Sequence, residues 1–477
     1  MTRTTKYSTL ARHKSSAPIF DRYIIVPISA CLYAVVASPL ILSLCNPLDP
    51  KCVLESRPEN KIFWPSMALI SVIFALQNRS RVGRLSLPPH IVCFLAYLAF
   101  AGASVAWAYK PELSFIRFAQ QVMIVISIVL PALLATRTAD MMLGLFICFA
   151  CASVLNVLFI LGGPPILPKG ATWGHTGYFL GKNSLGQCAS IALLLSFHEM
   201  LYSGRRRAAG IIFALIAASV LFLSNSKTSI GLALLVPCLA AVALFPGFMF
   251  PGKRMRISPA IILLIIPACY ILLSNVSGFN MHRVSYIIYG DSTFTGRTFI
   301  WDFVNSEIAR RPLLGWGYQS FWLVGPDGPS FLHARGWIKS MPHAHSGYLD
   351  TMLELGYVGF ALLLIFIIAT LHATGRMAEH EPARAWLVLS LVLFVIVTNF
   401  LESTWMRSFD FLWVVYLIAV AEIARHWQPS PPGGRARHGH RSSEALRLGP
   451  QAAFNRPATR STSSKIALAA DERPNSA

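Results

Sequence analysis

The sequence predicts an all-α integral membrane protein. Of its 477 residues, 55% are hydrophobic and 13% are charged, whereas roughly a quarter of the residues are charged in an average soluble domain. Apolar runs of about 20 residues, the length at which a helix crosses a bilayer, recur between residues 24 and 424. These observations leave no room for a large soluble domain.

The apolar windows predict about 12 transmembrane helices, with a long connection of short helices between the ninth and the tenth. The predicted spans are 24–44, 62–77, 90–109, 118–135, 141–163, 184–203, 208–224, 229–248, 258–275, 349–371, 385–400 and 409–424.

These spans divide the chain into five parts. Residues 1–23 form a basic N-terminal tail, 24–275 contain helices one to nine, 276–348 form the long loop, 349–424 contain the last three helices, and 425–477 form the C-terminal tail. The first span lacks a small-residue cleavage site, so we expect a retained signal anchor. The C-terminal tail is rich in Pro, Gly, Ser and Arg, a composition typical of disorder.

The basic residues predict how the helices are oriented. Most of the 41 Lys and Arg residues lie in the tails and in alternate connections, most densely at Arg205 to Arg207 and Lys253 to Arg256. Because cytoplasmic connections are enriched in these residues, both termini are expected in the cytoplasm and the 276–348 loop on the outer side. The net charge of +20 is scattered, without the basic, aromatic-interleaved surface of a nucleic-acid-binding protein.

The nine cysteines give two different expectations. Those inside predicted spans are expected to pack as small apolar residues. Cys45 and Cys52 instead flank the first outward connection, "CNPLDPKC", where an oxidising compartment permits a disulfide. The spacing leaves open whether that bond forms.

The outward connections bring cations close to the membrane surface. "GYFLGK" ends in Lys182, "SNSKTS" contains Lys227, and the long loop contains Arg283 and Arg297. Lys and Arg in such a layer suit a phosphate or diphosphate group, and the loop's aromatic residues and glycine turns suit sugar rings. No thiolate or His-rich set accompanies them, so neither a metal site nor a cofactor is expected.

The stretch "SMPHAHSGYLDTMLELGYVGF", residues 340–360, contains the candidate proton acceptor. A neutral histidine can accept a proton from an attacking hydroxyl. His345 could play that part, or could cap the following helix, and His343 is expected to be structural or to orient its neighbour. Asp350 and Glu354 share one helix face. The negative charge of Asp350 is favoured by the dipole at the start of the helix. Glu354 could either pair with another residue structurally or belong to the site.

Several motifs together resemble a known family. "HSGYLDTMLELGYVG" resembles the signature of bacterial O-antigen ligases and related polysaccharide polymerases, and "TGRTFIWDF" followed by "RPLLGWGYQSF" is similar to the pattern of that family's long periplasmic loop. "GYFLGKNSLGQ" and "SNSKTS" are most similar to the ExoQ-type exopolysaccharide production proteins. The resemblance covers about residues 170 to 370.

The resemblance implies an inverting, metal-independent glycosyltransferase of the bacterial inner membrane, with its site at the periplasmic face. Such an enzyme would take glycan from undecaprenyl diphosphate and polymerise exopolysaccharide repeat units, or, as an O-antigen ligase, transfer glycan to the lipid A core. The implied partners are the lipid-linked oligosaccharide, a glycan acceptor, membrane lipids, and other polysaccharide export and chain-length proteins.

The resemblance also assigns residues. His345 falls on the family's histidine, Arg297 on the loop arginine, and Lys227 where many ligases have arginine. Lysine keeps the charge but loses the bidentate fork. These three are the expected catalytic residues, and Lys182, Arg283 and Glu354 are expected to bind diphosphate or glycan. Gly356 and Gly359 are expected to allow close helix packing beneath the histidine.

A polysaccharide or lipid transporter is the alternative of a different class. Polar residues near helix ends could line its substrate path. However, no matched pair of broken helices indicates an inverted repeat, and the polar residues gather towards one face and not at the midplane. A purely structural membrane partner explains the long loop least well.

Overall fold

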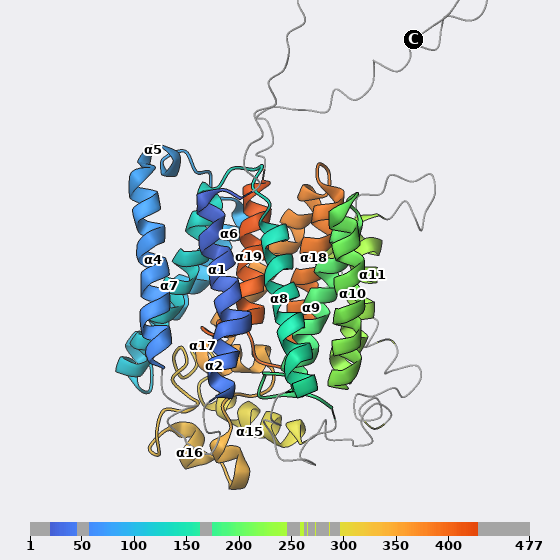
Figure 1. Cartoon of the computed structure of the whole chain (residues 1–477). Coiled ribbons are helices and arrows are strands. Elements are labelled where there is room, and N and C mark those ends of the chain that lie inside the picture. Colours follow the sequence, from blue (N-terminus) through green and yellow to red (C-terminus); the bar gives the residue numbers. More distant parts are fainter. Residues whose placement is uncertain are drawn as a thin grey trace, which may run out of the picture. The chain divides into compact units, whose positions relative to one another are not determined.

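The computed structural model describes residues 20–44, 57–162, 174–245, 258–261, 265, 272, 286 and 296–427. Every regular element within these residues is a helix and none is a strand, as the sequence predicts (Figure 1). Most of both expected tails, Arg283, the pair Cys45 and Cys52, and most of the expected span 258–275 lie outside the described residues.

The helices follow the apolar windows to within a few residues at most ends. Proline occupies the first turn of α4, α6, α7 and α18, where its fixed φ and missing N–H are tolerated. The elements are α1 (Arg22–Leu32), η1 (Tyr33–Ala37), α2 (Ser38–Ser43), α4 (Pro58–Gln77), α5 (Arg79–Val82), α6 (Pro89–Ala103), η2 (Ser104–Trp107), α7 (Pro111–Leu134), α8 (Met141–Gly162), α9 (Lys182–Met200), α10 (Arg205–Ser224), α11 (Lys227–Leu244), η3 (Pro259–Ile261), α15 (Arg297–Arg310), α16 (Pro329–His333), η4 (Gly336–Ser340), α17 (Gly347–Met377), α18 (Pro382–Thr398) and α19 (Phe411–Arg425).

Seven helical segments in the described part of the chain are long and apolar enough to cross a membrane. They are the continuous run through α1, η1 and α2, the run through α6 and η2, and α7, α8, α10, α11 and α17. The helix α18 is apolar but has only 17 residues. The chain is therefore a multi-pass membrane protein by length and composition, while the total of 12 spans stays a prediction.

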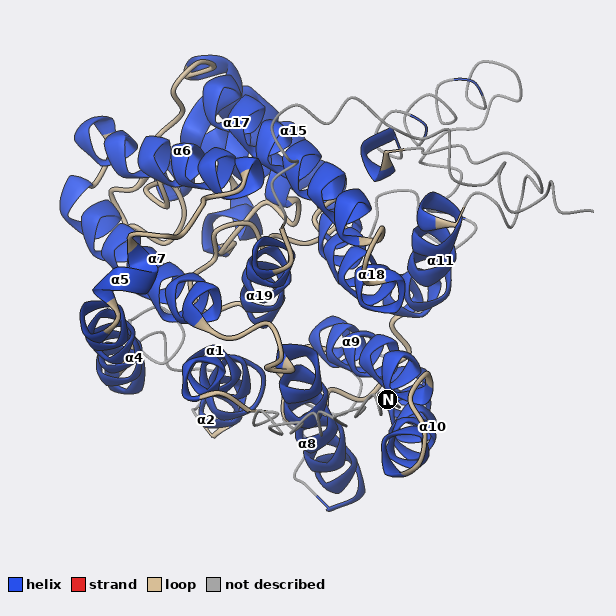
Figure 2. Ribbon diagram, turned by 90° about the horizontal axis from the view of Figure 1, so that it is seen from above, coloured by secondary structure: helices blue, strands red, loops and turns tan. Residues whose placement is uncertain are grey.

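The helix α19 forms the centre of the bundle. Each of its residues from Phe411 to Arg425 is buried, and it packs against α1, α6, α7, α17 and α18 (Figure 2). Because a helix that is apolar on all sides must be covered on all sides, the sequence "FLWVVYLIAVAEIAR" predicts this position. The chain entering α19 is consequently held at the middle of one end of the bundle.

Ion pairs hold the opposite end of the bundle. Arg206 at the start of α10 pairs with Glu199 of α9 at 2.5 Å and with Asp140 before α8 at 3.0 Å. Glu422 near the end of α19 pairs with Arg384 of α18 at 2.5 Å. The connections in these contacts are ones that the sequence assigns to the cytoplasm, and they lie together at one end of the bundle. The helices α15 and α16 lie at the other end (Figure 1). Which end faces the cytoplasm stays a prediction.

The helix α17 is broken at Gly356, whose φ of 65° and ψ of −170° are not helical. The preceding loop docks on this break through four backbone hydrogen bonds. They run from Trp316 N–H to Leu353 O (2.9 Å), Gly317 N–H to Glu354 O (2.8 Å), Tyr357 N–H to Pro312 O (2.8 Å) and Val358 N–H to Leu313 O (3.3 Å). The sequence predicts that Gly356 allows close packing of another helix. This prediction is wrong, because the backbone of a loop and not a helix makes the close approach to Gly356.

Replacing Gly356 with alanine is expected to destabilise the protein by about 2–4 kcal/mol, because this backbone region is essentially restricted to glycine. An added Cβ would also lie 2.1 Å from the carbonyl oxygen of Leu313. Thermal unfolding of the detergent-solubilised protein measures the effect. Gly231→Ala is the matched control, since nothing lies within 4 Å of its added Cβ. Equal melting temperatures for the two variants would contradict the role of the break.

The segment from Gly296 to Ser346 has a small apolar core of its own. It consists of Ile300, Val304, Ile308, Trp316, Phe321, Trp322, Ala344 and Leu353. The helix α15 contributes Ile300, Val304 and Ile308 to this core and α17 contributes Leu353. The ring of His333, the last residue of α16, lies 5.9 Å from that of Trp316. The described part of the long loop thus packs on the N-terminal turns of α17, next to the candidate histidines.

Candidate active site

His345 lies in a tight turn between η4 and α17. Its φ of +52° is in the left-handed region that few residues other than glycine adopt. The turn is fixed by Asp350, whose carboxylate accepts from Ala344 N–H (3.1 Å) and from Trp322 Nε1–H (2.8 Å) and pairs with Arg407 (3.1 Å). Asp350 therefore anchors the histidine turn in addition to occupying the helix start.

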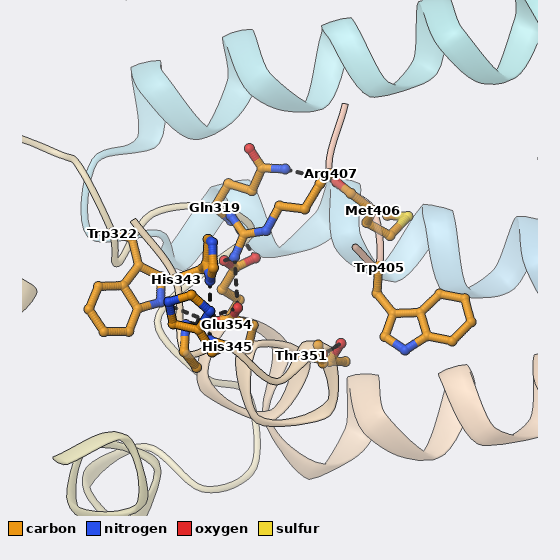
Figure 3. Close-up of polar contacts among 12 residues, drawn as sticks. Gln319, Trp322, His343, His345, Thr351, Glu354, Trp405, Met406 and Arg407 are labelled. Atoms are coloured by element: carbon orange, nitrogen blue, oxygen red, sulfur yellow. Dashed lines mark hydrogen bonds and ion pairs between the residues drawn. The ribbon is translucent and has the colours of Figure 1, made fainter. Parts of the chain in front are cut away.

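His343 orients its neighbour, as the sequence suggests it could. Its Nδ1 accepts a hydrogen bond from His345 N–H (3.1 Å), and the two ring centroids are 4.3 Å apart (Figure 3). Burial and the adjacent His345 lower the pKa of His343 to about 4. His343 is therefore neutral at physiological pH and can keep accepting this bond.

Glu402 joins three elements of the chain at His345. Its Oε1 accepts from Arg297 Nη2 (2.7 Å) and from Asn183 Nδ2 (3.0 Å), and its Oε2 lies 3.3 Å from His345 Nδ1. A second nitrogen of Arg297 donates to the backbone carbonyl of Leu401. The arginine of α15, the start of α9 and the histidine before α17 thus meet at one carboxylate.

The loop after α18 holds Glu402 in place. The side-chain oxygen of Asn399 accepts from the backbone N–H groups of Thr404 (3.0 Å) and Trp405 (3.1 Å). Gly347 N–H, at the start of α17, donates to the carbonyl oxygens of Asn399 (2.9 Å) and Glu402 (3.0 Å). A Cβ on Gly347 would lie 2.0 Å from Asn399 Oδ1. This close packing fixes Glu402 relative to His345.

The carboxylate determines which nitrogen of His345 can act. Burial raises the pKa of Glu402, but the hydrogen bond with His345 and the charge of Arg297 outweigh it and lower the pKa to about 2. The ionised carboxylate can only accept hydrogen bonds, so His345 Nδ1 carries the proton in this contact. The Nε2 atom is then the acceptor of a neutral imidazole, which is the arrangement that a general base requires.

The two lysines lie at the starts of neighbouring helices. Lys182 is the first residue of α9 and Lys227 the first of α11. Asn183 Oδ1 accepts from Ser226 Oγ (3.2 Å), the side chain that precedes Lys227. Because Asn183 also contacts Glu402, both helix starts lie beside the cluster around Glu402. Within the described ranges, no group of three or more His, Cys, Asp or Glu side chains is arranged to hold a metal ion.

Glu354 is engaged within the protein. It is buried, its Oε1 lies 3.2 Å from Arg407 Nη2, and its Oε2 accepts from Gln319 N–H (3.0 Å), as Figure 3 shows. Of the two alternatives that the sequence leaves open, the contacts favour structural pairing. Arg283 lies outside the described residues, so its expected place in the site stays a prediction.

Sequence reasoning missed Glu402, Asn183 and Arg407. Glu402 and Arg407 lie in the short connection 399–410, which no motif drew attention to, and Asn183 lies in "GKN", where only the lysine was singled out. A signal was nevertheless present, because a carboxylate in the layer that contains the cations needs a partner there.

Comparisons with known proteins agree with the resemblance that the motifs predict. Residues 211–364 match the O-antigen ligase family model, a range that includes Lys227, Arg297 and His345 but not Lys182 or Glu402. The chain is 26% identical over 322 residues to the exopolysaccharide production protein ExoQ of Rhizobium meliloti, over 64% of this chain and 71% of that protein.

Proteins of Rickettsia that are provisionally named polysaccharide ligases are also similar. The protein of Rickettsia prowazekii is 37% identical over 131 residues, and that of Rickettsia felis is 25% identical over 127 residues. The matched part is 26% of this chain and 31% of each relative. Together these similarities indicate an enzyme that transfers glycan in exopolysaccharide production. They do not distinguish a polymerase from a ligase.

Proposed function

We propose that this chain is an inverting, metal-independent glycosyltransferase that polymerises exopolysaccharide repeat units carried on undecaprenyl diphosphate. The observation that carries the proposal is the contact of Glu402 with both Arg297 and His345, because it sets an anion-binding cation beside an oriented general base. Lys182, Lys227 and the N-terminal ends of their helices complete the site. We place this site at the periplasmic face of the bacterial inner membrane, with both termini cytoplasmic.

The diphosphate of the donor is proposed to bind where three helices begin. Arg297, Lys182 and Lys227 are the first residues of α15, α9 and α11, and none of these helices has an acidic residue in its first turn. A helix N-terminus carries partial positive charge and normally favours anions. Cations placed there add to that charge, so three helix starts that each carry a cation suit a diphosphate.

His345 is proposed to activate the acceptor. Its Nε2 takes the proton from an acceptor hydroxyl while that oxygen forms a bond to the anomeric carbon of the donor sugar. The bond from the anomeric carbon to the diphosphate oxygen breaks, and undecaprenyl diphosphate leaves with the electron pair. Attack from the side opposite the leaving group inverts the anomeric configuration. Glu402 stabilises the imidazolium that forms, as a buried carboxylate does in other histidine-based sites.

The remaining expected residues have secondary parts in this proposal. Arg283 is proposed to add a further cation for diphosphate or glycan. Glu354 is proposed to act on the glycan through Gln319 and Arg407, which it holds in place. The partners follow from the reaction: a lipid-linked oligosaccharide, a glycan acceptor, membrane lipids, and other polysaccharide export and chain-length proteins.

The alternatives differ in the acceptor or in the reaction. An O-antigen ligase would use the same donor site and transfer glycan to the lipid A core. A polysaccharide or lipid transporter would need polar residues along a path through the bundle, whereas Arg297, His345, Glu402 and the two lysines of the proposed site gather at one end. The similarity to ExoQ over 64% of the chain favours the polymerase.

Deleting the gene is expected to abolish long secreted polysaccharide and leave lipopolysaccharide unchanged, because only polymerisation would be lost. Gel analysis of secreted and membrane-bound glycans measures both products, and complementation with the intact gene is the control. Loss of long O-antigen chains from the lipopolysaccharide, with free lipid-linked O-antigen accumulating, would assign the ligase reaction instead.

A further inference from the structure

We propose that a pocket on the His343 side of the histidine pair binds an acidic sugar of the acceptor glycan, through Arg57, Arg117 and Arg407. This inference rests on the proposed glycosyltransferase function. The pocket has a volume of about 460 Å³, within the usual range of small-molecule sites. His343 lines it, and the ring of His343 contacts that of His345.

The three arginines reach the pocket from parts of the chain that are distant in sequence. Arg57 precedes α4, Arg117 lies in the second turn of α7, and Arg407 lies in the loop before α19. Such convergence needs the folded bundle, so it is not a local run of surface charge. Guanidinium groups are suited to carboxylates because their parallel N–H groups can bind both oxygens.

The protein neutralises these charges only in part. Arg117 donates to the backbone carbonyls of Gln319, Trp322 and Leu323, and Arg57 donates to Ser38. In the part of the chain that the structure describes, neither arginine has a carboxylate in ion-pair contact. Backbone carbonyls orient a guanidinium without cancelling its charge.

The carboxylates near the pocket do not make the net charge of its lining negative. Arg407 is paired with Asp350 and Glu354, neither of which lines the pocket. Asp410 is the one acidic residue of the lining, and it accepts from the N–H groups of Leu412 and Trp413. Burial raises the pKa of Asp410 to about 7, so its negative charge is incomplete at neutral pH. The lining is therefore positive overall.

The uncharged lining suits a sugar. Asn60 and Gln319 contribute amides, Ser403 a hydroxyl and Trp322 an aromatic ring. Figure 3 shows Gln319, Trp322 and Arg407 around the two histidines. Amides and hydroxyls can bond to sugar hydroxyls, and an aromatic side chain can pack against a pyranose ring. Arg57 and Arg117, which have no carboxylate in ion-pair contact among the described residues, and Arg407, which is already paired, stand among such groups and favour a sugar that bears a carboxylate.

The place of the pocket favours the acceptor over the donor. The cations proposed for the diphosphate gather around Glu402, at Nδ1 of His345, whereas the pocket contacts His345 through His343. A donor and an acceptor on different sides of the histidine would bring the anomeric carbon and the attacking hydroxyl together beside it. An acidic residue in the pocket would hold the acceptor chain for that attack.

The test uses the full chain in nanodiscs with a lipid-linked donor and two matched acceptors. One oligosaccharide ends in glucuronic acid and the other in glucose. Replacing Arg57 with glutamine is expected to raise the KM for the acidic acceptor at least about 10-fold, with kcat and the KM for the neutral acceptor changed less than about twofold. Arg57→Lys is expected to lie between the wild type and Arg57→Gln. The exposed Arg79, at the other end of the bundle, provides the control Arg79→Gln.

Direct binding separates this inference from the proposed function. Binding of the two oligosaccharides without donor is expected to favour the acidic one, and Arg57→Gln is expected to remove that preference. That result would support the pocket even if the wild type transferred no glycan. Equal loss of affinity for both oligosaccharides, a raised KM for the donor in place of the acceptor, or no change in any variant would overturn the inference.

Discussion

Replacing His345 with asparagine is expected to lower the rate of glycan transfer by about 10²- to 10⁴-fold, the contribution of a general base. Asparagine tolerates the left-handed backbone conformation that His345 adopts at a φ of +52°. It can also keep a contact with Glu402, so the fold should survive while the proton acceptor is lost. Initial rates of transfer by the purified variant measure the effect.

A matched control for this variant lies on α17, the helix that follows His345. His372 is exposed on α17, so His372→Asn should leave the rate unchanged. Melting temperatures of both variants report whether the protein is intact. A folded His345→Asn variant that transfers glycan at more than about a third of the wild-type rate would remove His345 from the proposed mechanism.

Replacing Glu402 with glutamine is expected to lower the transfer rate by about 10²-fold or more, because the amide cannot stabilise an imidazolium as a carboxylate does. The amide also removes the partner charge of Arg297, 2.7 Å away. Glu402→Asp keeps the charge on a shorter side chain and should recover part of the rate. Rates of the two variants, each with its melting temperature, measure the effect.

The pH dependence of folding stability provides an independent test of the ion pairs of Glu402. The folded-state pKa of Glu402, about 2, is below that of an unfolded chain, about 4.3. Its ionised form therefore contributes stability that is fully present above about pH 4.3 and is lost as the pH falls towards 2. The wild type should exceed Glu402→Gln in stability near neutral pH, with a smaller difference at low pH. A difference that grew as the pH fell would contradict the ion pairs of Glu402.

Most helices could be predicted from the sequence because a membrane helix depends mainly on the apolar length of its own segment. Apolar length alone locates elements such as α8, expected at 141–163 and observed at Met141–Gly162. The break in α17 was not accessible in this way. Its cause is the docking of residues 312–317 on Gly356. A hydropathy window of about 19 residues does not include a partner that is 39 to 44 residues away in the chain.

The candidate site was accessible only where a motif named its residues. Arg297 and His345 were predicted, but Glu402, which joins them, is 57 residues from His345 in the chain. Its place depends on how the loop after α18 packs on the start of α17, which no periodicity encodes. The acceptor pocket was missed for the same reason, since Arg57, Arg117 and Arg407 meet only after the helices have packed.

The most direct test of the central claim is glycan transfer by the purified wild-type protein in nanodiscs that contain undecaprenyl-diphosphate-linked repeat units. We predict a ladder of lengthening glycan, unaffected by chelator, with one undecaprenyl diphosphate released for each glycosidic bond formed. A folded protein that left the donor intact under these conditions, or that moved the intact donor across the bilayer of a proteoliposome, would contradict the account.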